Sequence, residues 1–128
     1  MNSKMIVYNS NLYLHERELY ELNPSVDISS LKTISCDVFT LVGGRHDTPC
    51  QDSIYRKIIF DSPDLFDFLE CRAHYVLSRT TTDNIVVYVT GYTPAVVAVI
   101  NTCRRLGKNL FLMHYDTKWH YYRCQGVI

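Results

Sequence analysis

The fold of this chain is decided by residues 84–115, which read NIVVYVTGYTPAVVAVINTCRRLGKNLFLMHY. Residues 85–89 form a nearly continuous run of β-branched and aromatic residues, which is typical of a strand covered on both faces. Gly91 can take a backbone conformation that other residues avoid, Thr93 can cap a helix through its hydroxyl, and Pro94 suits the first helical position. The pattern predicts a central strand, a glycine-containing loop and a helix that begins at about Pro94.

The same stretch continues into a second strand. Gly107 is the residue expected just beyond the end of a helix, and Arg104 and Arg105 complement the negative end of the helix dipole. Residues 110–115 then read as another buried strand. Strand, helix and strand in this order form a βαβ unit, and ligands of open α/β sheets usually bind at the carboxyl ends of the strands. We therefore expect the loop of residues 90–93 to be a ligand site.

Three further segments extend this unit toward the N-terminus. An apolar run at residues 5–8 predicts a first strand. Residues 12–22 predict an imperfect amphipathic helix that ends before Pro24, because proline cannot continue a helix. Residues 33–42 alternate with period two, which indicates a long strand with two distinct faces. A glycine- and proline-containing loop of roughly ten residues follows, longer than a usual hairpin loop.

The remaining elements complete the predicted sheet. Residues 54–60 read as a strand that forms a hairpin or a neighbouring pair with the strand before it. A helix is expected over residues 63–78, with Ser62 as its cap and Pro63 at its first position. Residues 119–124 predict a final antiparallel strand at the sheet edge. The fold class expected from this order is an α/β three-layer sandwich, with a mostly parallel sheet and an antiparallel edge hairpin.

Length and charge limit the function classes. The chain has 128 residues, the size of one domain covering residues 1–128, and carries 13 basic and 13 acidic residues. A net charge of zero argues against a sequence-independent binder of long DNA or RNA, whose affinity comes mostly from phosphate neutralisation. A net charge of zero does not exclude a protein that binds a small nucleotide. The start of the chain lacks the apolar core of a signal peptide, and no apolar run could span a membrane, so we expect a cytoplasmic protein without membrane contact.

The cysteines and histidines do not predict a metal site. Five cysteines are odd in number and show no C-x-x-C pair, so they are interpreted as reduced thiols, several of them in the core. His114 and His120 lie on the two strands of the last hairpin, but no third ligand stands nearby, and a structural role is favoured. No metal or cofactor is expected. The cysteines are Cys36, Cys50, Cys71, Cys103 and Cys124.

The loop of residues 90–93 carries the first group of candidate ligand-binding residues. Its hydroxyls and the free N–H groups of a helix start suit a phosphate or carboxylate oxygen. An aromatic ring in such a loop can stack on a base or seal a pocket. The alternative is that Thr93 is only a helix cap. The candidates are Thr90, Gly91, Tyr92 and Thr93.

A second group follows the predicted strand of residues 33–42. After Gly43 and Gly44, Arg45 could hold a phosphate in a bidentate manner, and His46 could act as an acid or base near neutral pH. The alternative is a solvated loop in which both side chains face water. A small hydrolase acting through His46 is a further hypothesis.

The segment from residue 85 through the loop Thr90-Gly91-Tyr92-Thr93-Pro94 to His114-Tyr115-Asp116 resembles small single-domain Rossmann-like proteins of the CARF type. This group includes compact ring nucleases and cyclic-nucleotide-binding proteins that accompany or oppose type III CRISPR antiviral defence. The resemblance covers the second half of the chain well and the first half only in element order. It implies a Rossmann-like fold and a homodimer that binds a cyclic oligoadenylate across its two-fold axis.

The resemblance also implies which residues would line the pocket. Asn9 and Ser10, after the first strand, would join Thr90 to Thr93, after the central strand. Ring nucleases of this type work without metal, by orienting a ribose 2′-hydroxyl for attack on its own phosphate while cationic side chains stabilise the transition state. Arg45, His46 and Lys4 would be the local catalytic candidates.

Two functional hypotheses follow. The first is a cytoplasmic dimer that binds a cyclic oligonucleotide or related phosphate-bearing nucleotide signal and either sequesters or slowly cleaves it. The second is a non-enzymatic interaction module, such as a phage or accessory protein, that acts through its tyrosine-rich C-terminal hairpin, because aromatic residues are enriched at protein interfaces.

Overall fold

The computed structural model describes residues 2–9, 12–44, 52–58 and 61–128. In these residues seven strands form one sheet, accompanied by three α-helices and a short 3-10 helix. The strands are β1 (Asn2–Asn9), β2 (Leu12–His15), β3 (Thr33–Val42), β4 (Ser53–Tyr55), β5 (Asn84–Tyr88), β6 (Asn109–Asp116) and β7 (Tyr121–Gly126). The helices are α1 (Glu16–Leu22), η1 (Ile28–Ser30), α2 (Leu65–Leu77) and α3 (Thr93–Leu106).

The sheet is mixed, and the predicted mostly parallel sheet is wrong. Its strand order is β2-β1-β3-β5-β6-β7, with β4 paired to β3 beside this path. The pairs β3–β4, β3–β5 and β5–β6 are parallel, whereas β1–β2, β1–β3 and β6–β7 are antiparallel. The antiparallel edge hairpin of the prediction is confirmed by the β6–β7 pair. The error arises from β1, which runs opposite to β3.

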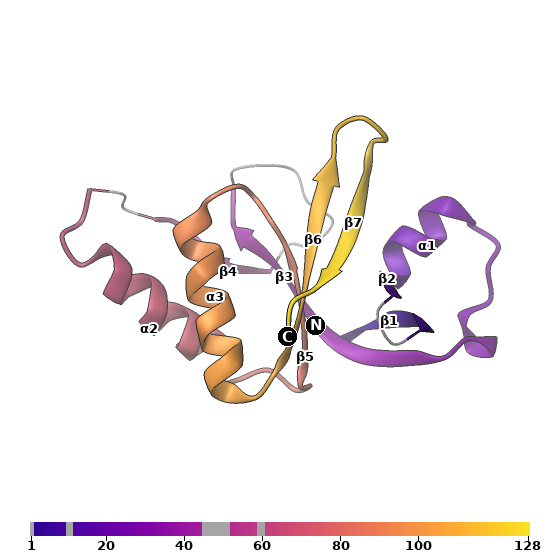
Figure 1. The fold of residues 1–128 in the computed structure, drawn as a ribbon, viewed down its shortest axis with the longest axis horizontal. Coiled ribbons are helices and arrows are strands. Elements are labelled where there is room, and N and C mark those ends of the chain that lie inside the picture. Colours follow the sequence, from indigo (N-terminus) through magenta and orange to yellow (C-terminus); the bar gives the residue numbers. More distant parts are fainter. Residues whose placement is uncertain (1, 10–11, 45–51, 59–60) are drawn as a thin grey trace.

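The sheet also curls until its two ends meet, so that it approaches a closed barrel. β2, at one end of the strand order, returns into contact with β7 at the other. Figure 1 shows α2 and α3 on one side of the central strands and α1 with β1 and β2 on the other. The predicted three-layer Rossmann-like sandwich is therefore wrong, because the second face is covered by the curled end of the sheet itself and not by a layer of helices.

The curl gives the central strand two different apolar environments. Ile85 and Val87 belong to the larger core, which α2 and α3 cover, while Val86 and Tyr88 belong to a smaller core inside the curled sheet. All four side chains are fully buried. The continuous apolar run of β5 thus reflects burial on both faces, as its sequence predicted.

Aromatic contacts close the smaller core. The rings of Tyr13 on β2 and Phe111 on β6 lie 4.8 Å apart, and those of Tyr88 on β5 and Tyr122 on β7 lie 4.8 Å apart, both in edge-to-face arrangements. Such pairs add to the burial of apolar area. The buried members of this core are Met5, Cys36, Val38, Val86, Tyr88, Phe111 and Met113.

The predicted βαβ unit is confirmed. β5 and β6 are parallel and joined by α3, and Gly107 ends the helix in the left-handed conformation with φ of 69°. One detail of the start is wrong. Thr93 is the first helical residue and Tyr92 the N-cap residue, and no side-chain cap bond is formed there. Thr93 therefore does not cap the helix through its hydroxyl.

The N-terminal half departs further from the prediction. Residues 12–15 form β2, paired antiparallel with β1, and the helix predicted to begin there starts only at Glu16. Helix α2 is shorter than predicted, with Asp64 as its N-cap residue. β4 extends only from Ser53 to Tyr55, and of the two predicted arrangements with β3 the neighbouring pair is confirmed, because the two strands are paired in parallel and form no hairpin. In the described part of the chain no helix is long and apolar enough to span a membrane.

Candidate functional site

The loops that follow β3 and β5 meet at the carboxyl edge of the parallel strands. Thr90 Oγ1 accepts a hydrogen bond from the backbone N–H of Val42 at 3.1 Å, and its hydroxyl lies 3.5 Å from the Val42 carbonyl oxygen. Thr90 is buried, so its side chain serves as a tie between loops. The turn at Gly43 and Gly44 is thereby held next to the turn at Gly91.

Both turns contain an exposed glycine in the left-handed region. Gly44 has φ of 76° and Gly91 has φ of 86°, and a Cβ atom built at either position would meet no atom of the described residues within 4 Å. As far as the described chain is concerned, space therefore remains beside the backbone at both turns. A ligand could approach the main chain closely here, and a larger side chain would be strained and would occupy that space.

The start of α3 offers fewer backbone donors than the sequence suggested. Ala95 and Val96 both donate their N–H groups to the Tyr92 carbonyl, at 3.1 and 3.3 Å, and Pro94 has none. The exposed Thr93 stands at the first helical position, where the helix dipole is positive. Tyr92 is half-buried and packs against the larger core. The Tyr92 side chain is thus held in place by the larger core.

The other predicted site residues are not brought to this edge by the described chain. β1 runs antiparallel to β3, with Asn2 opposite Asp37 and Ile6 opposite Thr33. The backbone of Asn9 therefore lies at the end of the sheet away from Thr90, and Lys4 lies between them. Ser10, Arg45 and His46 lie outside the described residues. The pocket implied by the resemblance would need β1 to run parallel to β5.

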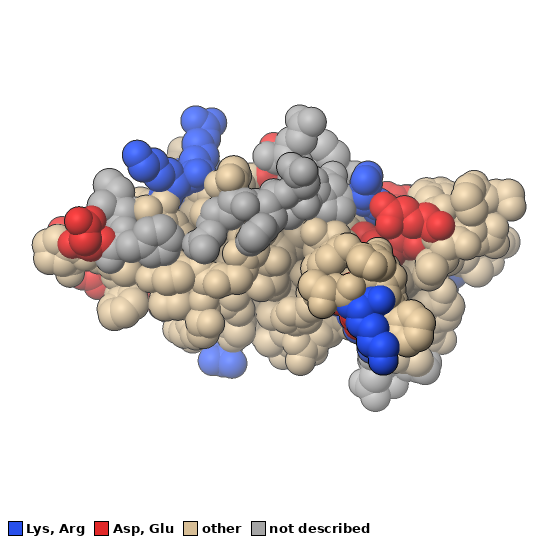
Figure 2. Space-filling model, turned by 90° about the horizontal axis from the view of Figure 1, so that it is seen from above, with Lys and Arg blue, Asp and Glu red and all other residues tan. Residues whose placement is uncertain are grey.

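The charged side chains of the described residues do not gather into one patch on the face around the tip of the β6–β7 hairpin (Figure 2). Figure 2 looks onto the end of the molecule toward which β6 points in Figure 1, and its blue and red side chains lie in small separate groups. This agrees with a net charge of zero. A ligand on this face would be bound by a few specific contacts rather than by a broad positive field.

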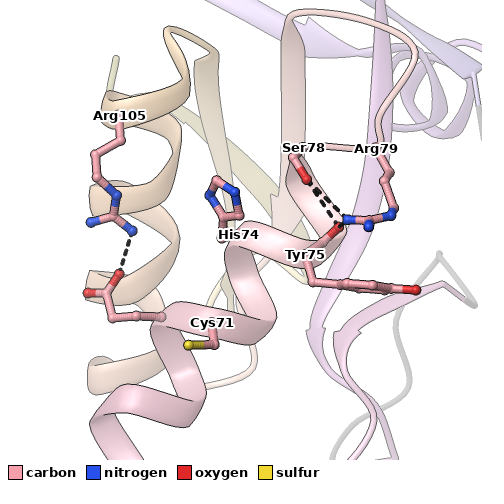
Figure 3. A pocket seen from close by; sticks show the side chains of 7 residues that line it. Cys71, His74, Tyr75, Ser78, Arg79 and Arg105 are labelled. Atoms are coloured by element: carbon pink, nitrogen blue, oxygen red, sulfur yellow. Dashed lines mark hydrogen bonds and ion pairs between the residues drawn. The ribbon is translucent and has the colours of Figure 1, made fainter.

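A shallow pocket lies between α2 and α3, on the outer side of the larger core (Figure 3). Its charged groups already have protein partners. Arg105 forms an ion pair of 2.9 Å with Glu70, and Arg79 donates to the Tyr75 carbonyl oxygen at 2.7 Å while its guanidinium lies 3.8 Å from the centre of the Tyr75 ring. The pocket is lined by Glu70, Cys71, His74, Tyr75, Ser78, Arg79 and Arg105.

A buried polar network, which the sequence analysis missed, crosses the interior of the curled sheet. The Tyr88 hydroxyl lies 2.8 Å from Glu18 Oε1 and 2.6 Å from His15 Nδ1, so it is hydrogen-bonded to both. The other ring nitrogen of His15 lies 2.6 Å from Ser3 Oγ, and that hydroxyl contacts Glu16 Oε1 at 2.8 Å. The five residues come from β1, β2, α1 and β5.

Burial sets the protonation of this network. Desolvation lowers the pKa of His15 to about 4, despite the nearby Glu16 carboxylate, and raises the pKa of Glu18, despite its hydrogen bonds with the Tyr88 hydroxyl and the Tyr122 backbone. Burial likewise raises the pKa of Tyr88. Glu18 is only 2% exposed. Nothing in the sequence sets Glu18 apart from Glu16 and Glu21 of the same segment.

Two of the predicted core cysteines are confirmed. Cys36 and Cys103 are buried free thiols, and burial raises their pKa values to about 12 and about 11. Cys71 is exposed, and Cys50 lies outside the described residues. The buried thiols therefore stay protonated and act as small apolar side chains.

Comparison of the chain with models of protein families, with curated proteins and with solved structures found no match in any of the three. The resemblance to CARF-type proteins therefore rests on the residues quoted for it alone.

Proposed function

We propose that this protein binds a small phosphate-bearing nucleotide, of the cyclic oligonucleotide class, at the carboxyl edge of β3 and β5. The contact between Thr90 and Val42 carries the proposal, because it places two exposed glycine turns side by side where ligands of parallel α/β units bind. Arg45 and His46 follow directly after Gly44 in the chain. They are our candidates for holding phosphate, and for the slow cleavage that would make the protein a ring nuclease.

The glycine turns support binding through the backbone. Main-chain N–H groups can approach a phosphate closely only where side chains are small, and no described residue fills the space in the direction of a Cβ atom at Gly44 or Gly91. Thr93 adds a hydroxyl and the positive end of the α3 dipole. Binding at the interface of a homodimer is part of the same proposal, because the resemblance to CARF-type proteins implies a ligand bound across a two-fold axis.

Replacing Gly91 by arginine is expected to weaken nucleotide binding at least tenfold without unfolding the protein. The new side chain would fill the space beside the turn, and the strained backbone would change its shape. The measurement is isothermal titration calorimetry with cyclic oligoadenylates, cyclic dinucleotides and inorganic phosphate as separate titrants. Absence of heat with every titrant in the wild-type protein would overturn the proposal.

Gly107 provides the matched control. It has φ of 69°, also leaves open space at the Cβ position, and lies at the far end of α3 from the proposed site. Gly107→Arg adds the same charge and a similar strain, so it should lower stability as much as Gly91→Arg but leave the affinity unchanged. Equal loss of affinity in both variants would show that the effect is not local to the Gly91 turn.

The second candidate function, an interaction module, is favoured by the exposed aromatic residues of the β6–β7 hairpin. Trp119 at its tip is 60% exposed, Tyr115 is 49% exposed, and Lys118 lies 5.3 Å from the Trp119 ring. Tyr122 instead points inward onto Tyr88. The partner that we propose for this surface is a second copy of the chain.

Trp119→Ala is expected to shift a dimer toward monomer, with a dissociation constant raised at least tenfold, because central aromatic residues carry much of the energy of an interface. Sedimentation equilibrium over a range of protein concentrations measures the change. Phe66→Ala is the control, because Phe66 is 68% exposed and belongs to α2, a helix that lies apart from the β6–β7 hairpin in Figure 1. A wild-type protein that stays monomeric at all concentrations would rule out this use of the hairpin.

A further inference from the structure

The buried network has four hydrogen-bond contacts, but Tyr88, Ser3 and a neutral His15 together carry only three protons that can be donated. Four contacts join Glu18, Tyr88, His15, Ser3 and Glu16, at 2.8, 2.6, 2.6 and 2.8 Å. Each contact at such a distance needs one proton between its two heavy atoms. The hydroxyls of Tyr88 and Ser3 and a neutral imidazole supply three. A fourth proton is therefore required somewhere along the chain.

The fourth proton has two possible places. Glu16 Oε1 accepts from both the Ser3 hydroxyl and the Lys4 amide, the latter at 3.2 Å, so that oxygen acts as an acceptor. The proton then sits either on Glu18 or on His15. When the proton is on Glu18, the Tyr88 hydroxyl donates its hydrogen bond to His15. When the proton is on His15, the Tyr88 hydroxyl donates to Glu18. Burial disfavours the ion pair, because each charge would lose its hydration.

We propose that Glu18 is a neutral carboxylic acid at neutral pH and that its proton keeps β2 and α1 packed over the interior of the curled sheet. We call this chain of hydrogen bonds from Glu18 through Tyr88 and His15 to Ser3 the latch. In this arrangement Glu18 donates to Tyr88, Tyr88 donates to His15 Nδ1, and His15 donates through Nε2 to Ser3. Each of the four contacts then has one donor and one acceptor, with Ser3 donating to Glu16 as the last of them. The chain ties the segment of residues 12–22 to β1 and to the central strand β5.

Loss of the proton would open the latch. Glu18 Oε2 is buried and makes no hydrogen bond in the described residues, and for an ionised carboxylate the loss of hydration outweighs the contacts of the group with the Tyr88 hydroxyl and the Tyr122 backbone. The charged groups that face Glu18 are Arg17 and Glu21 of its own helix, with His15 of β2, Tyr88 of β5 and Tyr122 of β7 as the titratable neighbours. Arg17 is already paired with Glu21 at 3.5 Å on the exposed side of α1. Release of α1 toward water is the simplest way to hydrate the charge.

The pH dependence of stability follows from counting protons in the two states. The unfolded values are 4.5 for glutamate and 6.5 for histidine, the pKa of His15 falls to about 4 on folding, and that of Glu18 rises. With Glu18 protonated up to neutral pH, as proposed, the folded chain between pH 4.5 and 6.5 holds one proton on Glu18 and the unfolded chain holds one on His15, so the stability does not change with pH through this pair. Above pH 6.5 only the folded chain keeps its proton, and the unfolding constant should rise up to tenfold per pH unit until the pKa of Glu18 is passed.

Infrared difference spectra between the wild-type protein and Glu18→Gln test the proposal directly. The wild type at pH 7 should show the carbonyl band of a buried neutral carboxylic acid, and Glu18→Gln should lack it. Glu21→Gln, on the exposed side of the same helix, should keep the band. A wild-type spectrum without this band at pH 7 would overturn the proposal, even if Glu18→Gln failed to fold.

Urea unfolding between pH 6 and 9, with hydrogen exchange of the α1 amides, tests the latch. The wild type and Glu21→Gln should lose stability as the pH rises above 6.5, and the protection factors of α1 should fall in parallel. Glutamine keeps the size of Glu18 and can donate to Tyr88 without titrating, so Glu18→Gln should abolish this fall. A variant with the wild-type pH dependence would exclude Glu18 as the proton carrier.

Discussion

Tyr88→Ala is expected to lower the free energy of unfolding by about 3–5 kcal/mol from lost aromatic packing alone, the largest effect of any substitution considered for this protein. Tyr88 is fully buried, and its ring packs edge-to-face on Tyr122 at 4.8 Å. The change also removes the hydroxyl that joins His15 to Glu18. Removing the partner of His15 Nδ1 and of Glu18 Oε1 adds about 1–3 kcal/mol for each atom. Urea unfolding followed by circular dichroism measures the loss.

Tyr88→Phe separates the two contributions. It keeps the ring in the smaller core and removes only the hydroxyl, so the loss should fall to the hydrogen-bond part of the effect. Tyr8→Ala is the control, since Tyr8 is 58% exposed on β1 and its removal should change stability by no more than about 0.5 kcal/mol. A loss below about 1 kcal/mol for Tyr88→Ala would contradict the packed interior of the curled sheet.

Asp37→Ala is expected to lower the free energy of unfolding by about 3 kcal/mol, because a buried carboxylate that accepts several hydrogen bonds is lost. Asp37 on β3 is 3% exposed and accepts from the Thr82 amide at 2.8 Å, the Thr82 hydroxyl at 2.7 Å and the Thr81 hydroxyl at 3.2 Å. These bonds hold the link before β5 against β3. Chemical unfolding with Asp83→Ala as control tests this, since the Asp83 side chain is 85% exposed. Equal losses in the two variants would contradict it.

The same carboxylate makes the protein sensitive to acid. Burial alone would raise the pKa of Asp37, but the hydrogen bonds from Thr82 and Thr81 outweigh it and hold the pKa below its ordinary value of 3.8. The folded chain therefore binds this proton less readily than the unfolded chain. The stability that Asp37 contributes is fully present above pH 3.8 and is lost as the pH falls through its lower folded pKa. Asp37→Asn should lose this part of the acid dependence.

The local elements of the second half were predictable because their signals lie close together in the chain. The apolar run of β5, the helix with Gly107 after it, and the hairpin of β6 and β7 depend on neighbouring residues only. The segment of residues 12–22 shows where this reasoning fails. Its leucines suit a helix, but Leu12–His15 pairs with β1, and the interior accepts Tyr13 against Phe111. Tertiary contacts overrode a weak local preference.

The candidate site was predictable only in part, for the same reason. The Gly91 turn could be found from strand and helix signals on either side of it, and its neighbour at Gly43 and Gly44 was recognised as a separate loop. Their contact through Thr90 and Val42 joins residues 48 positions apart. Asn9 was assigned to the same pocket on the assumption that β1 is parallel, and its antiparallel pairing with β3 places it at the other end of the sheet.

The sequence by itself determined which segments are buried, where α3 ends and where β6 begins. It also placed glycines at the turns after β3 and β5. These features were predictable because hydrophobic periodicity and backbone preference act over a few residues. Only the tertiary structure decided the direction of β1, the curl that brings β2 to β7, and the meeting of Glu18, Tyr88 and His15. These features depend on pairing between distant strands, whose free energy comes from burying shared surfaces that no single segment displays.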